Sequence, residues 1–369
     1  MKFVCEKSVL SDALGNVSKA VSDKSTISSL ESIKFSLNEN TLELTGHDLE
    51  LGIRTTIPVS SPDKGSFLAG SRLFSDMVRK MPDGDICVSL DDNMMLTIEG
   101  GNTSYNMNAL PADDYPELPG KESSDPIDIP QSVLKSMIVQ TKFAASLLDI
   151  KPILKGELFE IAEGRVALVA IDGYRLAVRY EPLGYQGTVS FIVPAKNLDE
   201  VSKLLSDDDE GVCSIYLAKK HIIFEIGAYL VSSRLLEGEF HPYKNAIPAG
   251  HNTEVIVERT KLINSLERCM LLISEKSPSP VRCRFENGQL SIKCHTSSVG
   301  KVHDELGVEM TGNPIEIGFK CRYFLDPLKA VSDDKVKLQI GGNLQPMKIV
   351  PLEGDKFIYL VLPVRLPKE

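Results

Sequence analysis

The chain of 369 residues has few of the residues and spacings that support metal or redox chemistry. It has no Trp, and its six His residues stand at least eight positions apart, so none has the spacing of a metal-ligand pair. The cysteines are scattered without a C-x-x-C pair, at Cys5, Cys87, Cys213, Cys269, Cys283, Cys294 and Cys321. This pattern excludes a disulfide framework or zinc ribbon and favours reduced thiols. We therefore expect no metal site and no cofactor.

Long apolar segments and nucleotide or hydrolase motifs are also missing. No apolar run approaches the roughly 18 residues of a membrane helix. The opening MKFVC is interrupted by Glu6 and Lys7, so it does not resemble a signal peptide and predicts a first strand. The chain lacks G-x-x-x-x-G-K-[ST], G-x-S-x-G and H-E-x-x-H. We expect a cytoplasmic protein without membrane contact and without catalytic activity of its own.

The chain does contain one long sequence pattern that occurs three times. A short amphipathic helix, an acidic or glycine turn and two alternating strands begin at Ser71, at Ala195 and at Cys321. The three starts lie 124 and 126 residues apart. Solenoid repeats run about 20–50 residues, so this spacing indicates repeated domains.

A second predicted helix and further predicted strands precede each copy of this sequence pattern. Apolar residues at helical spacing mark the first of these helices, at Val9, Leu10, Ala13, Leu14 and Val17. Strand-like alternation with Gly, Asn and Asp at the turns follows in each copy. The fold class is therefore α+β, with three repeated modules of two helices against antiparallel strands. We expect helices at 7–24, 71–81, 131–143, 195–206, 259–273 and 320–331.

Two segments without periodicity separate the modules. Residues 116–130 hold four prolines, and residues 243–254 are polar with Pro248 and Gly250. Such stretches suit linkers between domains. We place the domains at 1–119, 120–247 and 248–369, each of a size that can bury its own core.

Charge is distributed unevenly over the predicted elements. The net charge is −10, which argues against a simple basic groove for nucleic acid. The six predicted helices nevertheless carry 16 Lys and Arg against 7 Asp and Glu, and the rest of the chain carries 25 against 44. Lys and Arg are good helix formers, which could explain this alone, but Glu is one as well and is scarce in these helices. Basic helices on an acidic body favour a surface that faces a polyanion.

Several segments together resemble the bacterial replicative sliding clamp family, the DNA polymerase III beta subunits. They occur in family order over the whole chain: MKF at the start, LTGHDLEL (44–51), LPADDYPEL (110–118), IDGYRLAV (171–178), FIVPAKNL (191–198), LLEGEFHPY (235–243), ISEK (273–276) and LVLPVRL (360–366). IDGYRLAV by itself predicts only an Asp-Gly turn between two strands.

The resemblance implies a DNA replication processivity factor. It implies a ring-shaped homodimer, joined head to tail, that encircles duplex DNA with its helices and tethers DNA polymerases and other clients. Loading would need a clamp-loader ATPase as a further partner. Phosphate contacts of this kind are independent of DNA sequence. The expected DNA-binding residues are Lys24 and Lys196, which match family positions, with Arg72, Lys142 and Arg322 added from repeat position. Each could instead be an ordinary solvated side chain.

The resemblance also implies two protein interfaces. In the dimer, Tyr105 and Met107 on the strand at 103–110 should pack against Leu271 and Leu272 of the other copy, although the leucines could belong to the core. A partner-peptide pocket should take short hydrophobic motifs of polymerases. Its expected residues, which could also be ordinary core, are Leu154, Ile171, Gly173, Tyr174, Arg175, Leu176, Pro242, Leu360, Val361, Leu362, Pro363, Val364 and Arg365. The sequence departs from the family pattern at His241 and Asn245, beside the pocket.

Two other functions remain open from the residues alone. An enzyme with its site between domains would need convergent titratable groups, which the sequence does not bring together in any motif. A scaffold built from the same modules without DNA would keep the repeat but would not need the basic helices.

Overall fold

The computed structural model describes residues 1–369 except 23, 122–124, 150, 209, 275–277 and 367–369. It divides into two compact units, each described here by itself. Unit 1 comprises Met1–Leu134 with Glu200–Leu235, and unit 2 comprises Lys135–Asp199 with Leu236–Glu369. The second module of the repeat therefore contributes strands to both units.

The helices begin where the periodicity predicts. Their bounds are α1 Lys7–Val17, α2 Ser71–Lys80, α3 Gln131–Thr141, α4 Ala195–Leu204, α5 Arg259–Met270 and α6 Cys321–Ala330. In α2 the buried residues Ser71, Phe74 and Val78 recur at helical spacing, which gives the helix its apolar face. The starts of α2, α4 and α6 confirm the three predicted positions.

The first helix ends earlier than the predicted residue 24. After Val17 the chain makes one turn of 3-10 helix, η1 (Ser18–Ala20), and Val21 is extended. The Ser18 hydroxyl donates to the Gly15 carbonyl at 3.2 Å, which occupies a group that the next helical turn would have used. A 3-10 turn also follows α3, at η3 (Lys142–Ala144). The prediction that the first α-helix continues past Val17 was wrong, because the chain changes to 3-10 geometry at Ser18 and to extended backbone at Val21.

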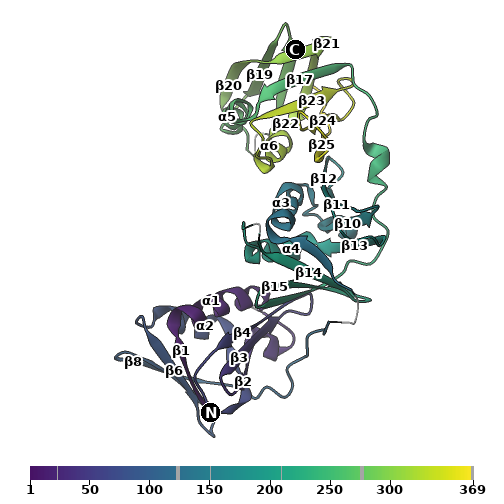
Figure 1. Cartoon of the computed structure of the whole chain (residues 1–369). Coiled ribbons are helices and arrows are strands. Elements are labelled where there is room, and N and C mark those ends of the chain that lie inside the picture. Colours follow the sequence, from purple (N-terminus) through teal and green to yellow (C-terminus); the bar gives the residue numbers. More distant parts are fainter. Residues whose placement is uncertain (23, 122–124, 150, 209, 275–277, 367–369) are drawn as a thin grey trace. The chain divides into compact units, whose positions relative to one another are not determined.

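Unit 1 contains two antiparallel sheets, with α1 and α2 packed against each other (Figure 1). The four-stranded sheet has the order β1-β6-β7-β8 and the eight-stranded sheet β5-β2-β3-β4-β16-β15-β14-β9. The strand bounds are β1 Lys2–Glu6, β2 Ser32–Asn38, β3 Thr41–His47, β4 Leu51–Pro58, β5 Lys64–Gly70, β6 Asp85–Leu90, β7 Met95–Gly100, β8 Thr103–Asn108, β9 Ile127–Pro130, β14 Val212–Leu217, β15 His221–Ile226 and β16 Tyr229–Arg234. The first of them confirms that MKFVC opens a strand.

Unit 2 also contains one large and one small antiparallel sheet, with α5 packed against α6. The nine-stranded order is β13-β10-β11-β12-β25-β24-β23-β17-β21, and the four-stranded order is β20-β19-β18-β22. The strand bounds are β10 Gly156–Ala162, β11 Arg165–Ile171, β12 Arg175–Pro182, β13 Val189–Pro194, β17 Thr253–Glu258, β18 Pro280–Glu286, β19 Gln289–Thr296, β20 Gly300–Gly307, β21 Glu309–Gly312, β22 Ile315–Lys320, β23 Lys335–Ile340, β24 Met347–Val350 and β25 Phe357–Val361.

One tight turn aligns the three modules residue by residue. It joins β2 to β3, β10 to β11 and β18 to β19, with the closing pairs Asn38↔Thr41, Ala162↔Arg165 and Glu286↔Gln289. Its first residue has positive φ in every module, 55° at Glu39, 54° at Glu163 and 53° at Asn287. A two-residue hairpin turn of this kind matches the twist of the flanking strands. Equivalent residues of β2, β10 and β18 are therefore 124 positions apart in successive modules.

Each large sheet is shared between two successive modules. In unit 1, β4 of the first module pairs with β16, the last strand of the second. In unit 2, β12 of the second module pairs with β25, the last strand of the third. By the same alignment β20 corresponds to β4 and β12, and β8 corresponds to β16 and β25. These two strands, β8 and β20, are outer strands of the two four-stranded sheets.

The core explains why most of these elements are specified by apolar residues. In unit 1, Phe35 stacks on Phe67 with 4.7 Å between ring centroids and meets Phe74 edge-on at 4.8 Å. Complete burial of one such side chain contributes about 1.5–3 kcal/mol. All seven cysteines are free, and six of them are buried. Burial raises the pKa of the Cys5 thiol to about 12, so it stays protonated and unreactive. None of the described helices is both long and apolar enough to span a membrane.

Candidate functional site

The candidate pocket is a cavity of about 650 Å³ in unit 2. Its lining comes from η4 (Pro152–Lys155), the β11–β12 turn, the segment around η5 (Tyr243–Ala246) and the end of β25. The lining residues are Lys151, Ile153, Leu154, Ile171, Gly173, Arg175, Leu176, Glu239, Phe240, His241, Pro242, Ala246, Pro346, Leu360 and Leu362. Buried apolar residues beneath them form the floor, including Leu158, Val169, Val178 and Tyr243. A largely apolar hollow with a few polar groups is the usual form of a ligand site.

The turn between β11 and β12 is held by its own aspartate. Asp172 Oδ1 accepts the backbone N–H of Tyr174 at 2.8 Å and that of Arg175 at 3.0 Å. Gly173 has φ 89°, a left-handed conformation that glycine adopts without strain. This confirms the prediction that IDGYRLAV contains an Asp-Gly turn between two strands.

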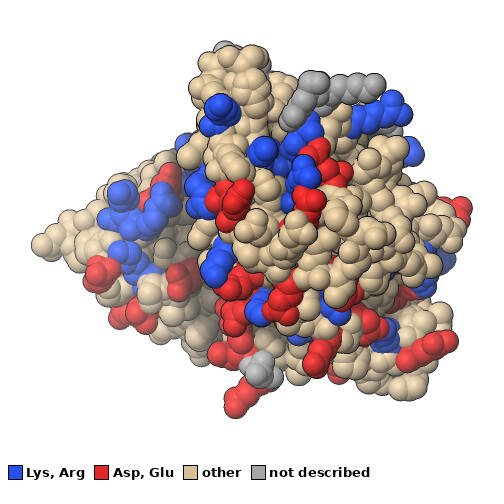
Figure 2. Space-filling model, turned by 90° about the horizontal axis from the view of Figure 1, so that it is seen from above, with Lys and Arg blue, Asp and Glu red and all other residues tan. Residues whose placement is uncertain are grey.

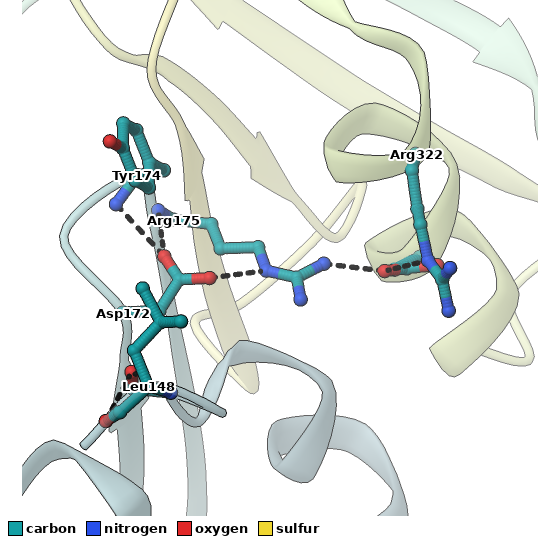
Figure 3. A network of polar contacts seen from close by, with 7 residues as sticks. Leu148, Asp172, Tyr174, Arg175 and Arg322 are labelled. Carbon is teal, nitrogen blue, oxygen red and sulfur yellow. Dashed lines mark hydrogen bonds and ion pairs between the residues drawn. The ribbon is translucent and has the colours of Figure 1, made fainter. Parts of the chain in front are cut away.

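A chain of charged groups joins this turn to α6 (Figure 3). Arg175 Nε donates to Asp172 Oδ2 at 3.0 Å, and its other end bonds to Asp326 of α6. Asp326 Oδ2 in turn lies 3.8 Å from Arg322 Nε. The Arg175 side chain is only 10% exposed and also lies over the Tyr323 ring, 4.6 Å from its centroid. Because both of its partners are anionic and partly buried, Arg175 is a fixed part of the pocket wall.

A second anchor holds the segment over the floor. The Tyr243 hydroxyl donates to Glu160 Oε2 at 3.0 Å, and Lys244 pairs with the same carboxylate. Phe240 and Ile247 pack against the apolar floor on either side of this anchor. The rim carrying His241 is thus attached to β10 by both polar and apolar contacts.

Eight of the thirteen residues expected in the pocket line it: Leu154, Ile171, Gly173, Arg175, Leu176, Pro242, Leu360 and Leu362. The remaining five do not. Val361 is completely buried in the sheet, and Val364 forms a bridge to Gly318 of β22. Tyr174 is half exposed and lies beside Tyr323, with 5.8 Å between ring centroids. Pro363 and Arg365 are not in the lining.

The sequence interpretation missed several lining residues, among them Lys151, Ile153, Glu239, Phe240, Ala246 and Pro346. No motif distinguishes them, because they come from irregular segments or from another module. The family resemblance rests partly on LLEGEFHPY, which includes Glu239 and Phe240, but it did not predict that these two residues line the pocket. Asn245 is exposed and does not line the cavity, whereas His241 does. The terminal Pro367, Lys368 and Glu369 lie outside the described residues.

The five basic residues expected at DNA lie on or near helices. Arg72, Lys196 and Arg322 are exposed and are the second residues of α2, α4 and α6. Lys24 is exposed in the segment after η1. Lys142 differs, since it forms an ion pair with Asp199 that partly neutralises it. In the part of the chain that the structure describes, the first turn of all six α-helices lacks Asp and Glu. Carboxylates are normally favoured there. Glu6 and Glu258 still stand at the N-caps of α1 and α5, whereas α2 and α6 begin after Gly70 and Lys320, so their starts are more open to an external anion.

Both signs of charge are present on the surface. The face drawn in Figure 2 carries Lys and Arg as well as Asp and Glu side chains. Several helix cations are paired with acidic neighbours, such as Lys7 with Asp83 at 2.8 Å and Lys329 with Glu267 at 2.6 Å. Arg72 and Lys196 make no ion pair with a described residue. These ion pairs therefore reduce the positive charge surplus of the helices, and the charge that remains is concentrated at a few positions.

The residues expected at a dimer interface are partly or fully open to solvent. Tyr105 and Met107 are half-buried and point to the same side of β8. Leu271 is 82% exposed at the end of α5, which does not fit a core residue, and Leu272 is half-buried. An exposed leucine beside an outer strand is a feature of association surfaces.

One buried carboxyl has no counterpart in the sequence interpretation. Glu157 of β10 is completely buried, and Thr141 donates its hydroxyl to Glu157 Oε2. Burial raises the pKa of Glu157 to about 8, against the smaller lowering effects of Thr141 and Lys142. It is remote in sequence from every motif and does not line the pocket.

Comparisons with known proteins agree along the whole chain. Three family models match in order: the N-terminal domain of the DNA polymerase III beta subunit at residues 1–119, its central domain at 128–242 and its C-terminal domain at 244–365. The beta sliding clamp of Halalkalibacterium halodurans is 31% identical, over 99% of this chain and 100% of the relative. That of Bacillus subtilis is 30% identical at the same coverage.

Solved structures are similar over the same extent. The Bacillus subtilis DNA polymerase sliding clamp aligns with a TM-score of 0.95 and 30% identity, covering 100% of both chains. A Pseudomonas aeruginosa sliding clamp bound to griselimycin aligns with a TM-score of 0.93 and 28% identity, covering 99% of this chain and 100% of that one. From matching domains, full-length relatives and a common three-module fold, this chain belongs to the DNA polymerase III beta subunit family, the bacterial sliding clamps.

Proposed function

We propose that this chain forms a head-to-tail homodimeric ring that encircles duplex DNA and holds replication proteins on it. As a beta sliding clamp it is a processivity factor of DNA replication and an accessory, non-catalytic subunit of DNA polymerase III. We place it in the cytoplasm, with domains 1–119, 120–247 and 248–369, as a partner of a clamp-loader ATPase.

The observation that carries the ring is the pairing pattern of the sheets. The fourth strand of a module pairs with the last strand of the next at β4–β16 and again at β12–β25. The fourth strand of module three, β20, and the last strand of module one, β8, have no such partner among the described strands. Joining β20 of one copy to β8 of another repeats the same joint and gives an eight-stranded sheet. Two such joints close two chains into a ring without a free edge.

The alignment also gives the register of that joint. In the β4–β16 pairing, Gly52 lies opposite Ser232. In the module alignment, Gly52 corresponds to Lys301 of β20, and Ser232 corresponds to Asn106 of β8. Tyr105 of one copy then lies opposite Val302 of the other. Both side chains are half-buried in the single chain, and their contact would cover the apolar side of each strand. Leu271 follows α5, which contacts β20 within the same module.

Sedimentation of a Leu271→Asp variant tests the ring. The wild-type chain should be a dimer at micromolar concentration, and the variant a folded monomer because a charge replaces an apolar contact. Leu344→Asp, at another exposed leucine (67% exposed), is the matched control and should remain a dimer. A variant that sediments as the wild-type dimer would contradict the proposed joint.

The DNA contacts are proposed from repeat position and exposure. Arg72, Lys196 and Arg322 occupy equivalent places at the starts of α2, α4 and α6, where free backbone N–H groups add to the positive potential. Lys24 supplies a further exposed cation, and Lys142 a partly neutralised one. Contacts to phosphates position the duplex without reading its sequence.

The pocket is proposed to bind short hydrophobic motifs of polymerases and other clients. Its apolar lining, with Leu154, Leu176 and Leu362 around the floor, supports this, as does its volume of about 650 Å³. A peptide that buries two large apolar side chains would gain about 3–6 kcal/mol before ordering costs. A micromolar affinity would suit partners that exchange. Of the alternatives left open by the sequence, an enzyme would need titratable groups that converge. Lys151, Glu239 and His241 line the pocket, but no hydrogen bond or ion pair joins these three side chains to one another.

A further inference from the structure

The outer face of β18–β20 carries a second hollow, which we call the basic groove. It has a volume of about 710 Å³, and its lining combines Arg282, Lys293, His295, Lys301 and His303 with Ser279, Pro280, Cys294, Val302 and Leu366. Ile292 and Cys294, which flank Lys293 in β19, are buried in the core shared with α5, although Cys294 also borders the groove. The groove therefore lies on the face of the sheet opposite to the helices.

The groove brings like charges together across neighbouring strands. Arg282 lies opposite Lys293, Lys293 opposite His303, and His295 opposite Lys301. Of these pairs, Arg282 and Lys293 carry like charges, and directly opposed like charges destabilise an antiparallel pair, with Cβ atoms about 5 Å apart. Arg282 is compensated by Glu316 and His303 lies 3.3 Å from Glu305, but Lys293 and Lys301 form no ion pair with any described residue. An anion placed over this face would remove the repulsion.

The residues of the basic groove in module three occupy positions that, in module two, form the floor of the apolar pocket. The turn alignment equates Arg282 with Leu158, Lys293 with Val169 and His295 with Ile171. Through their cross-strand partners, Lys301 corresponds to Leu176 and His303 to Val178. All five counterparts belong to the buried cluster under the candidate pocket.

The first module covers the same face with its own chain. Its counterparts include Thr45, His47 and Gly52, all buried. Tyr115 donates its hydroxyl to the Thr45 carbonyl at 3.3 Å, and the Leu118 side chain lies against Gly52. In the third module, by contrast, Lys293, His295, Lys301 and His303 are exposed. Lys34 and Arg54, the module-one counterparts of Arg282 and His303, are half-buried. The face is therefore mostly covered in modules one and two and is more open in module three.

We propose that the basic groove is a second partner site, which binds an acidic peptide segment. Carboxylates would pair with Lys293 and Lys301, and an apolar side chain would contact Leu366. Glu305 and Glu316 border the groove, so spaced carboxylates fit it better than a phosphate backbone, which is charged at every nucleotide. In the proposed ring the neighbouring strand adds Asn106 and Ser104 of the partner subunit to the same face, and neither is charged.

The test is fluorescence anisotropy of a labelled nine-residue peptide of Asp, Glu and Leu with the full chain at low salt. We expect saturable binding that weakens with added salt. Lys293→Gln with Lys301→Gln should weaken it about fivefold to tenfold, and Lys→Arg at both positions should restore it. Lys64→Gln with Lys219→Gln removes the same charge from exposed sites elsewhere and should leave binding unchanged. A peptide with Asn and Gln in place of the acids should not bind.

Two results would overturn the proposal. One is an unchanged affinity in the Lys293→Gln, Lys301→Gln variant, which would mean that the peptide does not use the groove. The other is tighter binding of an oligo-dT strand than of the peptide, abolished in that same variant, which would make the groove a nucleic-acid site. Because the groove belongs to one chain, the Leu271→Asp variant should still bind the peptide. Failure of the ring would therefore not affect this test.

Discussion

At the scale of single residues, Glu157 is the group whose chemistry the fold changes most. Its carboxyl is completely buried, and burial raises its pKa from 4.5 to about 8. Between these two pH values the folded chain holds a proton that the unfolded chain has released. The free energy of unfolding therefore falls as pH rises from 4.5 to 8, by at most about 1.4 kcal/mol per pH unit. Outside that window this residue adds no pH dependence.

Glu157→Gln should remove this pH dependence. The amide keeps the size and polarity of the side chain but does not titrate. The difference in stability between variant and wild type should therefore shift in favour of the variant from pH 6 to pH 9, by up to about 3 kcal/mol. Urea unfolding at both pH values measures the difference, in which all other titrating groups cancel. An identical pH dependence in the two proteins would refute a protonated Glu157.

Asp326 is the second residue whose role can be measured. It accepts a hydrogen bond from Arg175, whose side chain is 10% exposed. Asp326→Asn should lower the free energy of unfolding by about 1–3 kcal/mol, because a buried charge loses one anionic partner. Glu267→Gln, which breaks the half-exposed pair with Lys329, is the control and should cost under about 1 kcal/mol. Equal losses in urea unfolding would show that the Arg175 network adds no particular stability.

The sequence predicts the structural place of some residues and not of others. The Asp172-Gly173 turn was predictable, because a local side-chain hydrogen bond and a positive φ have a local signature. Pro346 in the pocket lining and Glu157 in the core were not, since their surroundings come from distant parts of the chain. The basic groove likewise depends on three strands that only the pairing register brings together.

At the scale of elements, the helix starts follow from the sequence but the sheets do not. Apolar periodicity is local, so the starts of α2, α4 and α6 agree with the repeat. Pairing of β4 with β16 joins residues that are more than 170 positions apart, and no local pattern encodes it. The sharing of sheets between modules therefore became visible only in the structure.

The register derived for the β8–β20 joint predicts a specific cross-link. Asn106→Cys with Lys301→Cys in one chain should form disulfide-linked dimers in high yield under mild oxidation, because the two positions face each other across copies. Each single-cysteine variant is a control, and six of the seven native cysteines are buried. Non-reducing electrophoresis measures the yield. If Ser104→Cys with Lys301→Cys, two positions out of register, cross-links better, the derived register is wrong.

At the scale of the whole molecule, a net charge of −10 has to be reconciled with DNA binding. A ring that encloses the duplex needs little affinity, so a few exposed cations on helices are sufficient. Replacing Lys24, Arg72, Lys196 and Arg322 by Ala should weaken DNA binding at low salt. It should also flatten the dependence of log K on log salt by about 0.9 for each phosphate that the variant no longer neutralises. Titration over a range of salt measures this.

The matched control removes four exposed lysines from strands and loops, Lys2, Lys64, Lys219 and Lys356. It carries the same net charge change but should keep the wild-type salt slope. If the slope flattens equally in both quadruple variants, DNA binding depends on overall charge, and the helix starts have no special role.

Retention on DNA of different topology tests the ring most directly. The protein would be loaded by a bacterial clamp loader onto nicked circular DNA, and half of the sample would then be cut once with a restriction enzyme. Gel filtration in high salt separates bound from free protein. We predict that the protein stays with the circles and is lost from the linear molecules, because only a closed path retains a ring. Equal loss from both forms, or equal retention, would contradict topological binding.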